Sequence, residues 1–322
     1  MRRTLRTSLT AALAGACLML TACGSPAASQ EQADAGVSVV TSTNVYGDIV
    51  KAIGGDKVDV KAIITKSSQD PHSYEATAQD RLAISKADLV VENGGGYDDF
   101  IHKMADDSKI SHDNVVSAVE VSGLAPEEAG GHSESTEGGH AHDHGEFNEH
   151  VWYSVPAMGR LADAVATKLG ALAPGSSAEF TANATAYKSR LSDLEGKLGA
   201  VKAAHSAARV AVTEPVPLYL LEAAGLENRT PAEYTAAIEE GSDVPPAVLR
   251  AATQLAASPD VSFLAYNEQT EGPQTEALKK AADAAGVPVV QFSETLPDGK
   301  TYLEWMTDNV ENISTALEKK KP

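Results

Sequence analysis

A long helical segment near the middle of the chain most constrains the fold. Residues 176–207 contain few helix breakers, and their apolar side chains recur at steps of four, three, four and three, at Tyr187, Leu191, Leu194, Leu198 and Val201. This spacing predicts one helix with a continuous apolar stripe. At ~1.5 Å rise per residue the helix would be about 45 Å long, which is enough to cross two domains. The chain on either side is therefore expected to fold into separate lobes that this rigid helix joins.

Strand and helix patterns alternate on both sides of this segment. Before it, short β-branched runs predict strands at 37–41, 58–64, 88–92 and 115–116, and helical spacing predicts helices at 44–53, 77–86, 97–104 and 156–172. After it, strands are predicted at 210–213, 261–266 and 287–292, with helices at 217–224, 246–257, 274–285 and 302–317. Such alternation predicts an α/β fold in which each lobe is a parallel sheet flanked by helices.

The alternation also predicts how the chain is divided. We expect an N-terminal α/β lobe at 37–172, a linking long helix at 173–207 and a C-terminal α/β lobe at 208–322. Ligands of open α/β sheets bind outside the carboxyl ends of the strands. With two lobes, the predicted binding site lies in the cleft between them.

The N-terminal residues have the pattern of a bacterial export signal. Three arginines among the first six residues precede an apolar run, Leu9–Leu20, that is short for a membrane span. Cys23 follows a Leu-Thr-Ala sequence that resembles a lipobox. We therefore expect residues 1–22 to be a signal peptide, Cys23 to be lipidated and residues 23–36 to form a flexible tether. The protein would be extracytoplasmic and lipid-anchored to the cell membrane; a secretory signal without lipid is the alternative.

Composition narrows the classes of function. The chain carries 26 Lys and Arg against 45 Asp and Glu, a formal net charge of −19, which argues against a nucleic-acid partner and favours a cation. Its two cysteines are Cys17, inside the predicted signal, and Cys23, its lipidation point. Neither a disulfide nor a thiolate metal site is therefore expected in the mature protein.

Histidines gather in one segment of the chain. Residues 130–154 hold five of the nine histidines, and most of the other residues before Phe147 are glycine, serine, threonine and acids. That composition cannot bury a core, so residues 121–149 are predicted to form a His-rich loop. Imidazole is a common zinc ligand, so we interpret the loop as an auxiliary metal-collecting segment, with a solvated linker as the alternative. Its metal-collecting side chains would be His132, His140, His142 and His144.

Four candidate metal ligands follow predicted strands or lie at the edge of a lobe. They are His72, His150, Glu214 and Glu294. Two imidazoles and two carboxylates can hold Zn²⁺ or Mn²⁺. A single glutamate after a strand is more often a surface or capping residue, so the combination supports the site more than any one residue does. Two of the four come from each predicted lobe, so the ion would lie between the lobes.

Four stretches resemble the zinc/manganese substrate-binding proteins of ABC transporters. They read TSTNVYGDIVKAIGGDKVDV, DPHSYEATAQDRLAISKADLVVENG, NEHVWYS and ETLPDGKTYLEWMTDNVENI, and they occur in the family's order. The resemblance implies two small α/β lobes, one long rigid helix between them and a metal ion in the cleft.

The resemblance also implies a role for each candidate ligand. His72 matches the ligand of the family's DPH motif, and His150 matches the ligand of its DPHVW segment, with Asn148-Glu149 here in place of Asp-Pro. Glu214 stands where zinc-type members have His and manganese-type members have Glu. Glu294 stands where the family has a carboxylate, usually Asp. The His-rich loop resembles the loop of zinc members.

The expected function is that of a monomeric metal-ion receptor that hands Zn²⁺ to an ABC permease. Manganese remains an alternative ion, because the two glutamates suit it. A zinc hydrolase is the second alternative, but the chain has no HExxH motif and four protein ligands would leave no room for an activated water. A metal-binding surface adhesin is the third. His102, His112 and His205 are expected to be solvated.

Overall fold

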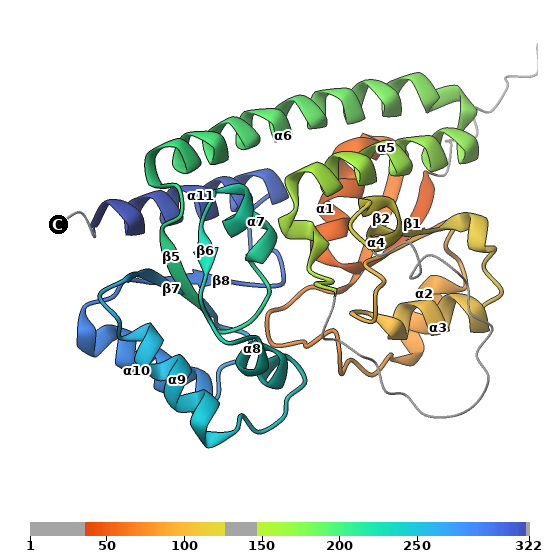
Figure 1. Ribbon diagram of the computed structural model, residues 1–322. Helices are drawn as coiled ribbons and strands as arrows, with labels where there is room; N and C mark the ends of the chain where they lie inside the picture. Colours follow the sequence, from red (N-terminus) through yellow and green to blue (C-terminus); the bar gives the residue numbers. More distant parts are fainter. Residues whose placement is uncertain (1–35, 126–146, 320–322) are drawn as a thin grey trace, which may run out of the picture. The chain divides into compact units, whose positions relative to one another are not determined.

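The computed structural model describes residues 36–125 and 147–319, which form two parallel sheets of four strands each (Figure 1). The first sheet has the strand order β2-β1-β3-β4, and the second has the equivalent order β6-β5-β7-β8. The first four strands are β1 (Val37–Thr43), β2 (Val58–Ile64), β3 (Leu89–Glu92) and β4 (Val115–Ser117). The last four are β5 (Arg209–Val212), β6 (Glu227–Asn228), β7 (Val261–Asn267) and β8 (Val289–Phe292). The predicted fold class is confirmed.

Helices connect and cover the strands. In the first lobe they are α1 (Asn44–Gly54), α2 (Ala78–Ile84), α3 (Asp99–Asp107), α4 (Ala118–Ser122) and α5 (Val155–Leu172). The long helix is α6 (Ser177–His205). In the second lobe they are α7 (Leu218–Ala223), α8 (Ala232–Glu239), α9 (Pro246–Ala256), α10 (Pro273–Ala285) and α11 (Tyr302–Lys319).

The long helix α6 contacts both lobes. It has 29 residues, and its apolar stripe is buried. Near its start, Asn183 Nδ2 donates a hydrogen bond of 2.9 Å to the carbonyl of Ile53 in α1. Further along, Lys197 pairs with Glu311 of α11 at 3.2 Å. Figure 1 shows the first half of α6 lying along α5 and the second half along α11, so one rigid element fixes the spacing of the two lobes.

The inner faces of both sheets share one hydrophobic core. Successive residues of a strand point to opposite faces, so Val39 of β1 enters the shared core while Val40 packs under α2 and α3. In the second lobe Val210 of β5 enters the shared core, whereas Ala211 packs under α8, α9 and α10. Helices α1, α5, α6 and α11 complete the shared core. The lobes are therefore joined by continuous apolar packing as well as by the chain.

Buried and partly buried hydrogen bonds also cross from one lobe to the other. Asn44, at the start of α1, donates from Nδ2 to the carbonyl of Leu296 at 2.8 Å and accepts from the Leu296 amide at 2.9 Å. Tyr302, at the start of α11, donates its hydroxyl proton to the carbonyl of Trp152 at 2.6 Å. Both pairs lie beside segments that carry candidate ligands, so they fix those segments against each other.

The turn after α1 depends on two glycines. Gly55 has a φ of 59°, in the left-handed region that glycine adopts without steric penalty. A Cβ on Gly54 would lie 2.3 Å from a methyl group of Val58, so only glycine allows β2 to start this close to the helix. The Gly-Gly pair that ends the predicted helix therefore also sets the position of β2, the strand that leads to His72.

Three elements of the structure are absent from the sequence prediction. Helix α4 has only five residues, and β6 has two exposed polar residues, so neither has a recognisable apolar period. Helix α8 lies between the predicted helices at 217–224 and 246–257, where the sequence predicts no element, and its last residue is Glu239. The predicted His-rich loop, 121–149, also overlaps ordered residues: Val121 and Ser122 end α4, and Glu149 is buried.

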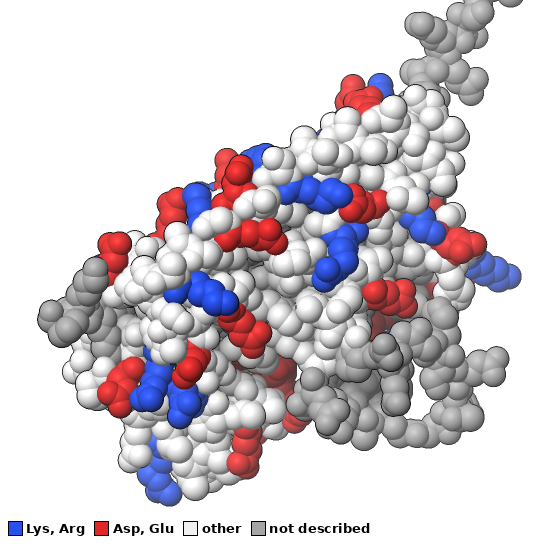
Figure 2. All heavy atoms as spheres, turned by 45° about the horizontal axis from the view of Figure 1, so that its top comes forward, with Lys and Arg blue, Asp and Glu red and all other residues white. Residues whose placement is uncertain are grey.

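The surface shown in Figure 2 carries interspersed acidic and basic side chains and no large basic field. Some of these charges pair between helices, as Lys188 of α6 does with Asp163 of α5 at 2.6 Å. Within residues 36–125 and 147–319, no helix combines the length and the apolar character that a bilayer span requires.

Replacing Tyr302 by Phe should destabilise the fold. The change removes the buried hydroxyl and leaves the Trp152 carbonyl without its partner, so the free energy of unfolding should fall by about 1–2 kcal/mol. Urea denaturation of both proteins measures the difference. Tyr266→Phe is the control, because the Tyr266 hydroxyl donates to the exposed carboxylate of Glu271, which water can solvate in its place, so stability should change by less than about 0.5 kcal/mol. An equal loss of unfolding free energy in the two variants would contradict the role given to Tyr302.

Candidate metal centre

His72 lies in the loop between β2 and α2, and Asp70 fixes the backbone of that loop. The Asp70 carboxylate accepts a 2.9 Å hydrogen bond from the amide of His72 and a 2.7 Å bond from the hydroxyl of Ser73. Pro71 between them is buried. The His72 ring meets Tyr97 edge to face, with ring centroids 5.0 Å apart. The Asp-Pro-His sequence therefore holds an exposed imidazole at the rim of the site.

His150 is buried and its ring orientation is fixed by Asn148. Asn148 Oδ1 accepts from the His150 amide at 3.1 Å and lies 2.8 Å from His150 Nδ1. The other end of the amide, Nδ2, donates to the carbonyl of Pro215 at 3.0 Å, which identifies Oδ1 as the acceptor facing the ring. Nδ1 therefore carries the proton, and Nε2 keeps the lone pair that can bind a metal. An aspartate at position 148 could not donate to Pro215 in this way.

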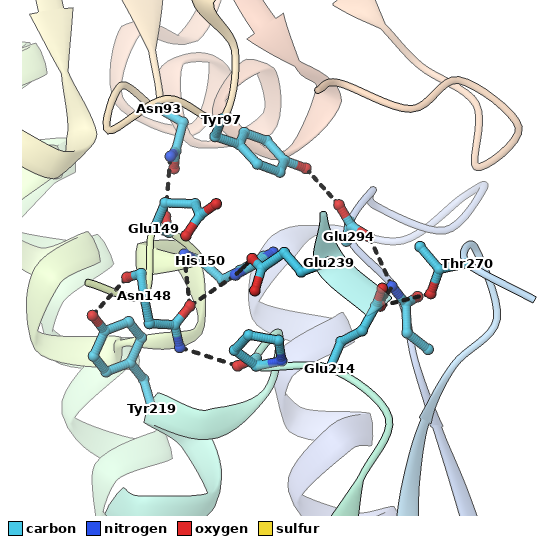
Figure 3. A network of polar contacts seen from close by, with 12 residues as sticks. Asn93, Tyr97, Asn148, Glu149, His150, Glu214, Tyr219, Glu239, Thr270 and Glu294 are labelled. Carbon is cyan, nitrogen blue, oxygen red and sulfur yellow. Dashed lines mark hydrogen bonds and ion pairs between the residues drawn. The ribbon is translucent and has the colours of Figure 1, made fainter. Parts of the chain in front are cut away.

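The two candidate carboxylates come from the second lobe and share one amide. Glu214 follows β5 and Glu294 follows β8, and both are buried. Asn267, at the end of β7, donates to both carboxylates from Nδ2. Thr270 donates to Glu214 at 2.6 Å, and Tyr97 of the first lobe donates to Glu294 at 3.2 Å (Figure 3). Neutral donors thus hold two carboxyl groups side by side.

Three of the four sequence-predicted ligands come together. His72, His150 and Glu294 each offer a ligand atom, and these atoms lie within 4.8 Å of one another. Glu214 lies outside that group because its carboxylate is turned toward Thr270 and Asn267, but it lines the same cavity of about 470 Å³. The described residues around this cavity include six acids and no Lys or Arg. The arrangement is suited to a divalent cation.

Burial raises the pKa of the two glutamates in the site and lowers the pKa of its buried histidine. Burial raises the pKa of Glu214 to about 7, against the hydrogen bonds from Thr270 and Asn267. Burial, and then the charge of Glu214, raises the pKa of Glu294 to about 8. Burial lowers the pKa of His150 well below its ordinary value, and His72 adds to that effect. His150 is therefore neutral at pH 7 and ready to bind a metal, whereas a cation would displace protons from the carboxyls.

Sequence reasoning missed several residues that shape the site. Tyr97 and Asn267 hold Glu294, yet a tyrosine in a turn and an asparagine at a strand end have no distinctive pattern. Glu239, at the end of α8, lies 3.8 Å from His150 Nδ1. Burial, and then the charge of Glu149, raises the pKa of Glu239 to about 9. Glu149 itself was noted only as a departure from the family motif.

The remaining histidines divide into two groups. His132, His140, His142 and His144 lie outside the described residues, as does Cys23. His102, expected to be solvated, instead contacts the buried Glu92, with His102 Nδ1 3.1 Å from a carboxylate oxygen. That hydrogen bond is the largest cause that raises the pKa of His102 to about 9.

Known proteins resemble this chain over most of its length. A family model described as "Zinc-uptake complex component A periplasmic" matches residues 39–316. The manganese ABC transporter substrate-binding lipoprotein scaA of Streptococcus gordonii is 24% identical over 309 residues, which cover 93% of this chain and 95% of that protein. The structure of the periplasmic zinc binding protein TroA from Treponema pallidum matches with a TM-score of 0.69 at 25% identity, covering 88% of this chain and 99% of that one.

One curated relative is matched over only part of its length. The zinc-binding lipoprotein AdcA of Streptococcus pneumoniae is 30% identical over 187 residues, which are 57% of this chain and 36% of that protein. The chain therefore spans about a third of AdcA but nearly all of scaA and TroA.

The metal-free protein should lose stability as the pH rises through the pKa values of the two buried carboxyls. Below about pH 4.3 both are protonated, folded or unfolded, and add no pH dependence. Above it the unfolded chain releases protons that the folded state still holds, since the folded pKa values are about 7 and 8. Stability should therefore fall until the pH passes about 8, which urea denaturation in a chelating buffer at about pH 6 and pH 8.5 would measure. Glu294→Gln should flatten this slope, and an unchanged slope in that variant would contradict the assignment.

Proposed function

Because the chain belongs to the family of zinc-uptake complex component A periplasmic proteins, we propose that it captures Zn²⁺ between its lobes and delivers the ion to an ABC permease for import. Members of this family are solute-binding receptors for metal transport and not enzymes. The observation that carries the proposal is the group of His72, His150 and Glu294, whose ligand atoms lie within 4.8 Å of one another in a cavity lined by acids.

The proposed ligand set is His72, His150, Glu214 and Glu294. His72, His150 and Glu294 need little movement to reach a common ion. Glu214 would complete the set by exchanging its hydrogen bond with Thr270 for the cation. Four protein ligands satisfy Zn²⁺ in tetrahedral geometry. The lobe boundaries proposed for this receptor are 37–172 and 208–322, with the long helix at 173–207.

Zinc is proposed over manganese on chemical grounds. Zn²⁺ stands above Mn²⁺ in the Irving–Williams order, so a site with two imidazoles binds zinc more tightly. The histidines at 132, 140, 142 and 144 would add an auxiliary zinc-collecting role, because imidazole alone holds Mn²⁺ weakly. The specific observation in favour of manganese is the carboxylate pair Glu214 and Glu294, since carboxylate oxygens suit that ion. A relative named as a manganese receptor, scaA, also covers nearly the whole chain.

The proposed location is outside the cytoplasm, with the chain held at the membrane by a lipid on Cys23 after removal of residues 1–22. The relatives AdcA and scaA are named as lipoproteins, which supports this proposal. We further propose that the receptor acts as a monomer and binds no nucleic acid, in keeping with its net charge of −19.

His72→Ala and His150→Ala should each weaken zinc binding by more than about a hundredfold, because each removes one of four ligands and admits water to the ion. Competition calorimetry against a chelator of known affinity measures the change. His205→Ala, at the far end of α6, is the matched control and should bind like the native protein. Near-native affinity in either ligand variant would remove that residue from the site.

Glu214→His should keep zinc binding and weaken manganese binding by about tenfold or more, because an imidazole replaces a hard oxygen ligand. Calorimetry with zinc and electron paramagnetic resonance with Mn²⁺ test the two ions on one preparation. In cells, growth of a deletion strain in chelated medium identifies the physiological ion. Rescue by manganese alone would overturn the zinc assignment and leave the ligand set standing.

A further inference from the structure

A second group of ligand atoms adjoins the proposed metal site. His72, Glu149 and Glu239 each offer an atom, and these atoms lie within 4.8 Å of one another. Glu149 comes from the first lobe, directly before His150, and Glu239 ends α8 in the second lobe (Figure 3). The group therefore uses both lobes and shares only His72 with the site described above.

The carboxyl groups of Glu149 and Glu239 contact each other, and neither is exposed. Glu149 is 2% exposed, and among the described residues its Oε1 has no hydrogen-bond partner. The Glu239 side chain is 12% exposed, and its Oε1 likewise has none. An unpaired buried carboxylate oxygen carries a large desolvation penalty unless a proton or a cation compensates it. Two carboxyl groups that share a proton beside an imidazole nitrogen form a site in which a divalent cation would take the place of that proton.

The group lies where two cavities meet. His72 and Glu239 line the cavity of about 470 Å³ that holds Glu214 and Glu294. The same two residues, now with Glu149, line a larger cavity of about 680 Å³ on the side of α3. An ion that moved from the larger cavity to the inner site would pass this group.

We propose that His72, Glu149 and Glu239 form a second divalent-cation position that an ion occupies before it reaches the inner site. One imidazole and two carboxylates bind Zn²⁺ or Mn²⁺, and only three protein ligands leave the remaining positions to water. Such a position binds more weakly than a four-ligand site and exchanges its ion more readily. Because His72 belongs to both, the two positions are filled in turn. This inference extends the proposed capture of metal and uses the same cargo.

Zinc titration of variants that lack the inner site tests the second position. The background is the mature chain with His132, His140, His142 and His144 changed to Ser, so that the loop contributes no binding. In this background His150→Ala disables the inner site and should retain one weaker zinc ion. Adding Glu149→Gln and Glu239→Gln should weaken that remaining binding at least tenfold. Glu240→Gln, the next residue after Glu239, is the matched control and should leave it unchanged.

The outcomes separate this inference from the proposed function. Equal zinc affinity with and without the two carboxylates would overturn the second position. Absence of a tight zinc ion in the background protein itself would overturn the proposed function instead. If His150→Ala does not fold, as judged by circular dichroism, Glu294→Gln disables the inner site with a nearly isosteric side chain, and the same comparison decides the matter.

Discussion

The structure depends on two buried carboxyl groups, Glu214 and Glu294, in one cavity whose described lining includes no Lys or Arg. Glu214 and Glu294 are held by an amide and two hydroxyls, which are neutral donors. These bonds position the carboxylates but remove little of the free energy that their proximity and burial require. Raised pKa values let the two carboxyls hold protons, and a divalent cation that displaced these protons would supply the compensation instead.

Packing between the two lobes fixes the geometry of the site. The shared core and the buried bonds between lobes resist separation, because rotating the lobes apart would expose apolar side chains of α6 and α11 and break pairs such as Asn44 with Leu296. The imidazoles of one lobe and the carboxylates of the other are therefore held at nearly fixed distances. Selectivity for one metal ion over another can then depend on the spacing of these groups as well as on their chemical type.

Much of this organisation was readable from the residues themselves. Local patterns can be recognised in a single sequence. They include the long helix, the alternation of strands and helices, and the two histidine motifs. The proximity of Glu149 and Glu239 could not be predicted from the sequence. The two residues are 90 positions apart, and only the packing of α8 brings them together. The turn of Glu214 toward Thr270 was equally hidden, since it depends on which donor lies nearest after folding.

The equal strand order of the two sheets has a further consequence. In both sheets the third strand in chain order is followed by or ends in an asparagine, Asn93 after β3 and Asn267 in β7. Asn93 donates to the carbonyl of Glu149, next to His150, and Asn267 donates to the carboxyls of Glu214 and Glu294 directly. The two equivalent sheets thus present imidazole groups from one lobe and carboxyl groups from the other. Because these groups lie in loops after the strands, substitutions there would exchange imidazole for carboxyl groups while both sheets stay intact.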